Sequence, residues 1–569
     1  MTSWRDAIEW RQDRLKVQLE PLRARRKQLI EAYEKLQSME MTVTSRGLTA
    51  DAILYALQQF EARISYLIND VSETMMAMAQ MADGVWTVQT LLLECRQKAK
   101  THGLEIRDGR LISNSGQRED EFASAAAELK PMIKGALDKA DAIDEAYYTR
   151  LTAVADGSYK SSEEGFSTSP GLSDLPQKGW TMGESAAWWS SLTESEKENM
   201  VREHPELIGN RDGIPMEWRD KANRARLPQE IAEMKSNVAE AKSRMDKAES
   251  TVGKDSLEYL NATNDYNRYR KKLGDLEGLQ KILEKNDSDV ASNPSKTRQS
   301  LIYLDTKSSS RVQAGVALGD VDRAKTVQMV VPGMNNTVGD NMDGLINDAQ
   351  KVRNTTFEES RNHSSSAGIH DKGDIATVAW MYRTPQNAEV ATTDLAEKAA
   401  PKMDRFMEGV QTSRQAMGVP KAEINVGAHS YGSTMAGIAV GKVREGTVHN
   451  IALYGSPGSG VQDVREYNID GQTYVSGVNT NDYVQGIGPD GSFGKDPMEM
   501  RGFKHLANNP ENDSQCKYIP TGAGSGVTKF CSKGDDNPFG RHSEYLKTGT
   551  GSLKDISRIM GGMEPEGEK

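Results

Sequence analysis

Apolar residues recur every three or four positions from Trp4 to about Ala155, in a region rich in Ala, Leu, Glu, Lys, Gln, Met and Arg. This spacing places the apolar side chains on one face of a helix, so it predicts long amphipathic helices that pack together. Clusters of Gly, Ser, Asn and Thr interrupt the pattern at TVTSRGLTAD and IRDGRLISNSG, and such clusters mark helix ends. We therefore predict an all-α bundle of antiparallel helices over residues 1–155.

The helical pattern stops at residues 156–180, where Ser, Gly and Pro dominate and predict a linker. Residues 181–227 are again helical in pattern and contain the pair Trp188 and Trp189. We expect this segment to pack on the sheet domain that follows later in the chain. Residues 228–290 combine many charges with repeated Ala, Met and Leu, which predicts a solvated helical hairpin or coiled-coil insertion.

The pattern changes after Asn293-Pro294, and short apolar runs now alternate with helical segments over residues 295–560. The runs are RQSLIYLD, VQAGVAL, TVQMVVPG, IATVAWMY, EINVGAHS, VHNIALYGSPG and TYVSGVN. Apolar strands separated by helices predict a mostly parallel sheet covered on both faces, which is the α/β class. The first two runs have no helix between them, so they predict an antiparallel hairpin at one edge of the sheet.

The run INVGAHSYGST, residues 424–434, joins a predicted central strand to a predicted helix through Ser430. In a nucleophile elbow the residues two positions before and after the serine are small, because strand and helix approach closely there. Ala428 and Gly432 meet this requirement. The turn exposes the hydroxyl at the end of the sheet, so we interpret Ser430 as a nucleophile. The alternative is a serine that only caps the helix.

Acyl transfer by a serine also requires a base. We favour His542, which lies in NPFGRHSEYL, before a terminal helix and after VTKF (Val527–Phe530), a candidate for the last strand. His505, in GFKHLANN, is the alternative, and it is expected in a helix or at the surface. His429 is next to the serine and is expected to pack beside the site rather than to reach the hydroxyl.

A carboxylate must orient the base, and backbone N–H groups must hold the developing oxyanion. We favour Asp482, in NTNDYV after a predicted strand, over Asp490 and Asp496 in a later glycine-rich segment. The oxyanion donors are expected after the strand TVQMVV and after the serine. The candidates are Gly333, which lets the chain turn closely past the serine, the N–H groups of Met334 and Tyr431, and the side chains of Asn335 and Asn336.

The composition limits the classes of function. A net charge of −11 argues against a nucleic-acid-binding protein. No apolar run approaches the roughly 20 residues that cross a bilayer, and the N-terminus lacks the apolar core of a secretory signal, so we expect no transmembrane segment and a cytoplasmic location. Cys516 and Cys531 either pair across a loop or remain free thiols, and Cys95 completes the three cysteines.

Motifs for metal ions and organic cofactors are not apparent. No Gly-x-Gly-x-x-Gly directly follows a strand pattern, and neither His-Glu-x-x-His nor Cys-x-x-Cys occurs. We therefore expect no cofactor and no metal.

The pieces VVPGMNN, AHSYGSTMAGIA, YGSPGSG and RHSEYL, preceded by WWSSLTESEKENMVREHPELIGNRDGIP, resemble an actinobacterial alpha/beta hydrolase family of unknown function. The resemblance covers roughly residues 180–225 and 295–560. It implies Ser430 as nucleophile, His542 as base and Asp482 as acid, in the chain order of that fold. The N-terminal helices are distantly similar to proteins exported by type VII secretion systems, which implies export without a cleavable signal peptide as an alternative location.

We therefore expect a serine hydrolase, of the esterase or lipase type, that acts on a small-molecule or lipid ester and less readily on an amide. The segments Gly339–Gly373 and Gly486–Gly540 are polar and glycine-rich and are expected to shape its pocket. The alternative is an interaction protein, or an exported effector, in which the hydrolase fold is idle. In that case the N-terminal bundle would bind a helical partner or form a homodimer.

Overall fold

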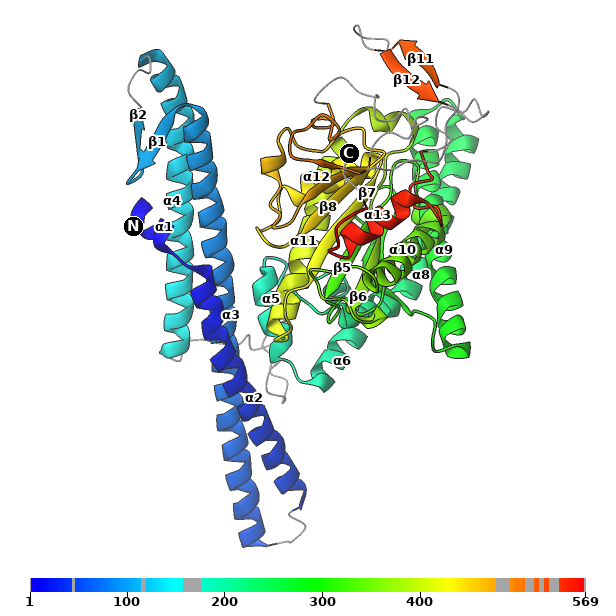
Figure 1. Ribbon diagram of the computed structural model, residues 1–569. Coiled ribbons are helices and arrows are strands. Elements are labelled where there is room, and N and C mark those ends of the chain that lie inside the picture. Colours follow the sequence, from blue (N-terminus) through cyan, green and yellow to red (C-terminus); the bar gives the residue numbers. More distant parts are fainter. Residues whose placement is uncertain are drawn as a thin grey trace. The chain divides into compact units, whose positions relative to one another are not determined.

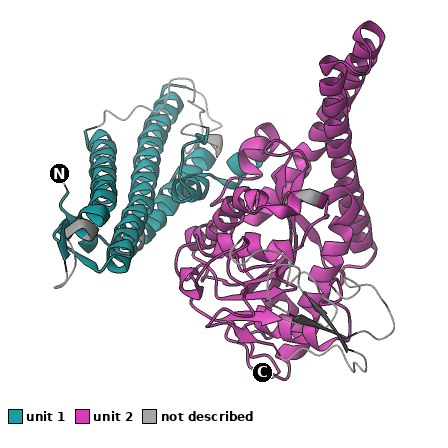
Figure 2. Cartoon of the chain, turned by 90° about the horizontal axis from the view of Figure 1, so that it is seen from above, with its two compact units in different colours: residues 1–198 teal, residues 199–569 magenta. Residues whose placement is uncertain are grey.

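A computed structural model describes the chain over residues 2–42, 47–113, 119–156, 175–476, 492–506, 516–520, 527–531 and 542–566. The chain forms two compact units, Met1–Glu198 and Asn199–Lys569 (Figures 1 and 2). Each unit has its own hydrophobic core. Within these ranges no helix combines the length and the apolar character that crossing a membrane requires.

Unit 1 is organised around one helix of 54 residues, α3. Its helices are α1 (Trp4–Glu9), α2 (Gln12–Thr42), α3 (Leu48–Thr101), α4 (Glu119–Ala155) and α5 (Met182–Ser191). Helix α2 packs along the first half of α3, whereas α4 packs along the second half (Figure 1). The amphipathic pattern therefore predicted the helical character of this region correctly.

The region is not all-α, however, because a β-hairpin stands between α3 and α4 in the chain. Strand β1 (Leu104–Arg107) pairs antiparallel with β2 (Arg110–Ser113). Asp108 and Gly109 form the turn with φ values of 47° and 75°, and positive φ at both positions is what a type I′ hairpin turn requires. The Asp-Gly pair between apolar residues carried this signal, but we interpreted the cluster only as a helix end.

Helix α5 belongs to unit 1, where it packs on α3. Arg150 of α4 pairs with Glu73 of α3 and, at 2.7 Å, with Glu184 of α5. These two carboxylates are buried, so the shared guanidinium fixes α5 to the bundle. Trp188 and Trp189 are buried as well. The unit boundary at Glu198 thus falls inside the segment 181–227, which we expected to pack on the sheet domain.

Unit 2 contains an eight-stranded sheet with the order β10-β9-β8-β7-β5-β6-β4-β3. The strands are β3 (Gln299–Asp305), β4 (Gln313–Leu318), β5 (Thr326–Val331), β6 (Ile375–Met381), β7 (Glu423–His429), β8 (Asn450–Tyr454), β9 (Thr473–Ser476) and β10 (Lys504–His505). β4 pairs antiparallel with β3 and β6, and the remaining pairs are parallel. The predicted α/β class, with an antiparallel hairpin at one edge, is confirmed.

Helices cover both faces of this sheet. Helices α11 (Asp394–Ala416) and α12 (Tyr431–Val440) contribute to one hydrophobic core, and α10 (Val338–Ser360) and α13 (Gly551–Met560) contribute to the other. Short helices complete the unit: α6 (Glu194–Glu203), which spans the unit boundary, α7 (Pro205–Ile208), η2 (Lys372–Asp374), η3 (Asn387–Ala391) and η4 (Val464–Glu466). Covered on both faces, the central strands are almost wholly buried.

A long helical hairpin, α8 (Met216–Val252) and α9 (Leu257–Ser292), precedes the sheet in the chain. It is not solvated along its whole length. Leu227 of α8 and Leu276 and Leu279 of α9 are buried in the same core as α10. One end of the hairpin is therefore part of the hydrolase unit rather than an independent insertion.

The last apolar run does not join the main sheet. β12 (Val527–Cys531) pairs antiparallel with β11 (Cys516–Pro520) in a separate two-stranded sheet. Our suggestion that Val527–Phe530 is the last strand of the main sheet is therefore wrong. That edge is formed by β10, which contains His505, so of our two expectations for His505, a helix or the surface, the helix is wrong.

Candidate active site

Ser430 lies at a sharp turn between the central strand β7 and helix α12. Its backbone has φ 54° and ψ −135°, a conformation that an L-residue adopts only when its surroundings impose it. The N–H of Ser430 donates to the carbonyl of Tyr454 on the neighbouring strand (3.0 Å), and its carbonyl accepts from the Ser433 hydroxyl (2.6 Å). The Ser430 side chain makes no capping hydrogen bond, so the alternative of a serine that only caps α12 does not hold.

Two glycines allow the chain to pass very close to this turn. A Cβ on Gly432 would lie 2.3 Å from the carbonyl oxygen of Pro332, and a Cβ on Gly333 would lie 2.6 Å from the Cβ of Ser430. Both distances are far below van der Waals contact, so larger residues are excluded. Ala428 on β7 is completely buried. The loop after β5 therefore lies directly against the serine, as the small residues had indicated.

The side chains of Asn335 and Asn336 brace this loop rather than donate into the pocket. The Asn336 amide donates to the carbonyls of Gly333 (3.1 Å) and Met334 (2.9 Å). Asn335 has φ 58°, and its side-chain oxygen accepts from the N–H of Asn387 (3.0 Å). The Asn336 amide nitrogen, one of the expected additional donors, is therefore engaged within the loop.

The backbone N–H of Tyr431 begins helix α12, and the first N–H groups of a helix have no partner within the helix. The Tyr431 side chain points elsewhere, because its hydroxyl donates to the carbonyl of Thr392 (2.6 Å). Burial raises the pKa of the Tyr431 phenol to about 12, and burial also raises the pKa of the Tyr454 phenol. Both phenols are thus neutral at physiological pH.

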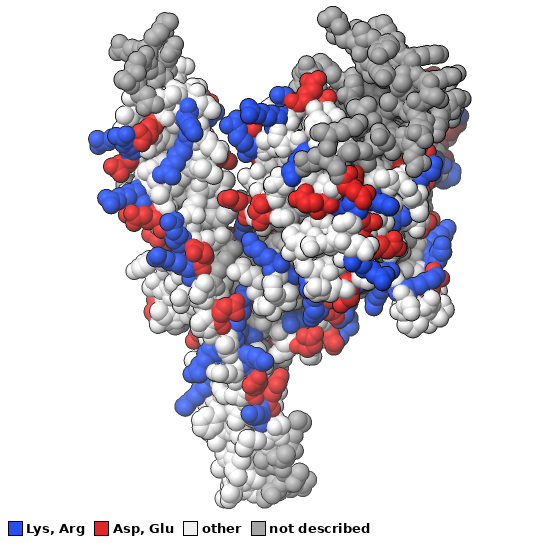
Figure 3. Space-filling model, viewed as in Figure 1, with Lys and Arg blue, Asp and Glu red and all other residues white. Residues whose placement is uncertain are grey.

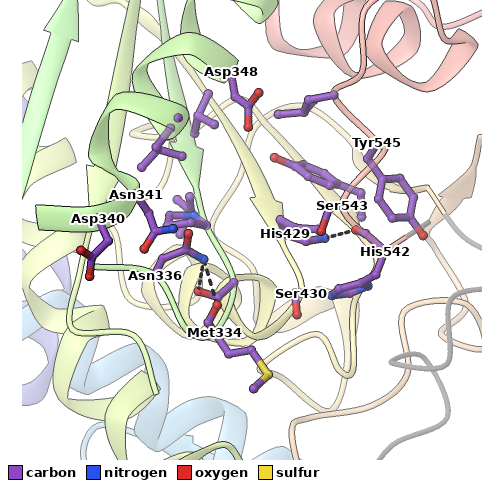
Figure 4. Close-up of a pocket in the computed structure, with 18 residues that line it drawn as sticks. Met334, Asn336, Asp340, Asn341, Asp348, His429, Ser430, His542, Ser543 and Tyr545 are labelled. Carbon is purple, nitrogen blue, oxygen red and sulfur yellow. Dashed lines mark hydrogen bonds between the residues drawn. The ribbon is translucent and has the colours of Figure 1, made fainter. Parts of the chain in front are cut away.

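Ser430 and His542 line the same cavity, which has a volume of about 330 Å³ (Figure 4). His505 does not contribute to its lining, so the structure brings the preferred histidine, and not the alternative, to the serine. The remaining lining comes from the end of β5 and the loop after it, from α10, from the last residues of β7 and β8 and from the segment before α13. It includes Met334, Asn336, Asp340, Asn341, Gly344, Leu345, Asp348, His429, Tyr454, Ser543, Tyr545 and Leu546.

The first predicted pocket segment, Gly339–Gly373, contains most of helix α10 and contributes a wall of this cavity. Most of the second segment lies outside the described residues, as do Asp482 and Asp490. Asp496 is described and accepts a hydrogen bond from the N–H of Met498 (2.8 Å).

His429 contacts the backbone of His542, a role that we did not predict. Its Nε2 lies 2.6 Å from the carbonyl oxygen of His542, so Nε2 carries the hydrogen and donates it. The two imidazole rings are 4.4 Å apart between centroids, and His429 also stacks on Tyr454 at 5.4 Å. The two histidines are 113 residues apart in the chain, so only the folded structure could reveal this contact.

Among the described residues that line the cavity there is no Lys or Arg, and the charged ones are Asp340 and Asp348. Asp348 pairs with Lys351 at 2.8 Å, and Asp340 accepts from the Thr337 hydroxyl at 2.8 Å. In the part of the chain that the structure describes, no group of three His, Cys, Asp or Glu side chains is placed to hold a metal ion.

A doubly covered, mostly parallel sheet with a serine at the turn after its central strand defines the alpha/beta hydrolase class. Residues 307–490 match the family described as Alpha/beta hydrolase. The chain is 30% identical over 243 residues to the uncharacterized protein Rv0963c of Mycobacterium tuberculosis (strain ATCC 25618 / H37Rv), covering 42% of this chain and 84% of that relative. The chain belongs to the alpha/beta hydrolase family.

A longer alignment links the chain to the uncharacterized protein Rv2079 of the same strain, at 25% identity over 407 residues. It covers 68% of this chain but only 57% of that relative, so the chain spans little more than half of the relative's length. Among solved structures, the chain is similar to a dienelactone hydrolase from Anabaena variabilis, at 13% identity and a TM-score of 0.23, covering 34% of this chain and 78% of that one. An arylesterase structure matches at 12% identity and a TM-score of 0.19, and the match covers 32% of this chain and 54% of the arylesterase chain. At this level of similarity, neither structure bears on the activity of the chain.

Proposed function

We propose that unit 2 is a serine hydrolase that cleaves an ester, and less readily an amide, through an acyl-enzyme. The observation that carries the proposal is the backbone of Ser430. Its positive φ holds the hydroxyl at the end of β7, in the cavity that the imidazole of His542 also lines. A strained serine that shares a pocket with a histidine is typical of acyl-transfer sites.

In the proposed reaction the Ser430 hydroxyl attacks the ester carbonyl while His542 accepts its proton. The tetrahedral intermediate collapses, and His542 returns the proton to the leaving alcohol. Water then attacks the acyl-enzyme with His542 as base, which releases the acid and restores Ser430.

The N–H groups of Met334 and Tyr431 are the proposed oxyanion donors. The contact of Gly333 with Ser430 supports this assignment, because it brings the following peptide to the reacting oxygen. Each such donor typically contributes about 3 kcal/mol to the stabilisation of the transition state. Asp482 is the proposed acid that orients His542, because it follows β9 in the position that the family reserves for this residue.

A fluorophosphonate probe tests the nucleophile, because it reacts covalently with an activated serine hydroxyl. We expect labelling of the wild-type chain and no labelling of Ser430→Ala. Ser543→Ala is the matched control, since Ser543 is an exposed serine that lines the same cavity, and this variant should label like wild type. Labelling that persists in Ser430→Ala, or a wild type that is not labelled, would contradict the proposal.

The size of the cavity supports a small acyl group. Pockets for small molecules typically span about 300–1,000 Å³, and the 330 Å³ here lies at the lower end. A series of nitrophenyl esters with increasing acyl length is therefore expected to show its highest kcat/KM at the short end.

A further inference from the structure

Helix α3 carries a continuous apolar seam along almost its whole length. The seam residues alternate at spacings of four and three, which is the heptad pattern by which helices pack against other helices. All members but one are apolar: Ile53, Leu57, Phe60, Ile64, Leu67, Val71, Thr74, Met78, Met81, Val85, Val88, Leu92, Cys95 and Ala99.

The second half of the seam is covered by α4. Val88 and Leu92 are buried in one core with Leu129 and Ile133 of α4. This cover extends no further along α3 than about Glu73, where Arg150 near the end of α4 pairs with that carboxylate. Figure 1 shows α2 and α3 continuing beyond the end of α4 as a two-helix arm.

In this arm the seam is only half covered. Leu57 faces α2 and is buried, but Ile53, Phe60 and Leu67 are 47%, 54% and 50% exposed. These three residues, spaced by seven, are called the arm seam below. The neighbouring Leu48 is 90% exposed. Large apolar side chains in a continuous heptad register normally contact another helix, so their exposure indicates a missing helical partner.

The charge of the arm limits what that partner can be. Between Leu48 and Leu67 the helix carries only Asp51, Glu61 and Arg63 as charged residues, and the lower end of the arm is mostly uncharged in Figure 3. With one cation over this length, the α3 side of the arm does not by itself attract nucleic acid or anionic lipid. This side of the arm is complementary to a partner helix that is equally apolar and carries its apolar residues at the same spacing of seven.

The arm seam of a second copy meets these requirements. If two α3 helices cross antiparallel with the two-fold axis at Phe60, Ile53 lies opposite the partner's Leu67, because both are seven residues from the axis. Arg63 and the partner's Glu61 then lie within a helical turn of each other, so the charges near the axis are complementary. Such an isologous contact satisfies both copies equally.

We propose that two copies of this chain associate through the arm seam, with their α3 helices antiparallel and each α2 flanking the contact. The two α2–α3 arms then form a four-helix arrangement. The proposal is independent of hydrolase activity, because every residue in it belongs to unit 1.

Sedimentation velocity of the full chain tests the proposal. We expect the wild type to be a dimer and Phe60→Glu to be a monomer, because the substitution places two carboxylates against each other at the axis. Tyr148→Glu is the matched control. Tyr148 is 70% exposed on α4 and outside the seam, so this variant should remain a dimer. Circular dichroism must show equal helix content in all three chains.

Cross-linking gives a second measurement that does not require disruption of the arm. Under mild oxidation, Phe60→Cys should form a disulfide-linked dimer, whereas Tyr148→Cys and the wild type should not. A wild type that remains monomeric up to its solubility limit would overturn the proposal. So would a dimer that survives Phe60→Glu and does not cross-link at position 60, or an arm that binds neutral lipid vesicles instead of a second copy.

Discussion

At the scale of single residues, the site depends on how the neighbours of Ser430 hold two side chains in place. The strained backbone of Ser430 sets the position of the hydroxyl, and this backbone is held by the hydrogen bonds of its N–H to β8 and of its carbonyl to α12. The imidazole of His542 belongs to a segment whose described residues, 542–550, form turns rather than helix or strand. His429 donates to the carbonyl of that same residue, so it ties the segment to the central strand. We regard His429 as a positioning residue for the proposed base.

The role of His429 can be measured by substitution. His429→Phe keeps a ring against Tyr454 but loses the donor to His542, so we expect kcat for ester hydrolysis to fall by up to about 10²-fold, the effect of a small misplacement of a reacting group. KM should change little, because His429 acts through His542. His429→Gln retains a donor and should recover part of the rate.

His505→Phe provides the comparison, since His505 lies on β10 and outside the cavity. It should leave kcat close to that of wild type. An equal fall of kcat in His429→Phe and His429→Gln would contradict this role, because it would show that kcat does not depend on the hydrogen bond to His542.

At the scale of elements, the close approach of the β5 loop to the β7–α12 turn is what brings candidate oxyanion donors to the serine. This approach depends on two positions without a Cβ, Gly333 and Gly432. The loop itself is held by the Asn336 amide and by Thr384, whose hydroxyl accepts from the N–H of Asn336 (3.1 Å). Local side chains therefore set the shape of the loop, and glycine sets its distance from the serine.

We expect Gly333→Ala to lower kcat/KM by at least about 10²-fold, which corresponds to loss of one oxyanion donor. The added Cβ would sit 2.6 Å from the Cβ of Ser430 and would push the loop away. Gly344→Ala is the matched control, because Gly344 lines the same cavity but an added Cβ meets nothing within 4 Å. Ester hydrolysis assays of both variants measure this difference in kcat/KM. An equal fall in kcat/KM in the two variants would argue against an oxyanion donor in the loop after β5.

At the scale of the whole molecule, the chain combines a helical unit with an alpha/beta hydrolase unit, and the site lies wholly in the second. Segments from distant parts of the chain meet at its cavity: the loop after β5, helix α10, the turn after β7 and the segment before α13. The acid of the proposed triad has two candidates. Asp482 is the candidate from chain order, whereas Asp348 of α10 is one of the two described carboxylates that line the cavity, and its charge helps to raise the pKa of the Tyr454 phenol.

Paired substitutions distinguish the two acids. If Asp482 orients His542, Asp482→Asn should lower kcat by about 10⁴-fold, as expected when the base is held in the wrong tautomer. Asp348→Asn should then affect kcat by less than tenfold, with any change appearing in KM because Asp348 faces the cavity. The opposite result would assign the acid to α10. Denaturation midpoints of both variants should match that of wild type.

The sequence alone predicted those features that depend on local patterns. Amphipathic spacing predicted the helices of unit 1, and continuous apolar runs predicted the buried parallel strands. The small residues around Ser430 indicated a tight strand-to-helix turn, because the space at such a turn is decided by residues within two positions of it. The Asp-Gly hairpin of β1 and β2 was equally local, and it was missed although its signal was present.

The tertiary structure alone decided which distant segments meet. It brought His542 rather than His505 to Ser430, joined His429 to the backbone of His542, placed α5 on α3, and ended α4 before the arm seam was covered. None of these follows from periodicity, because the period of a segment fixes which face is apolar but not what covers it. Local propensity therefore determined the elements of this protein, and packing between segments far apart in the chain determined its site and its unpartnered surface.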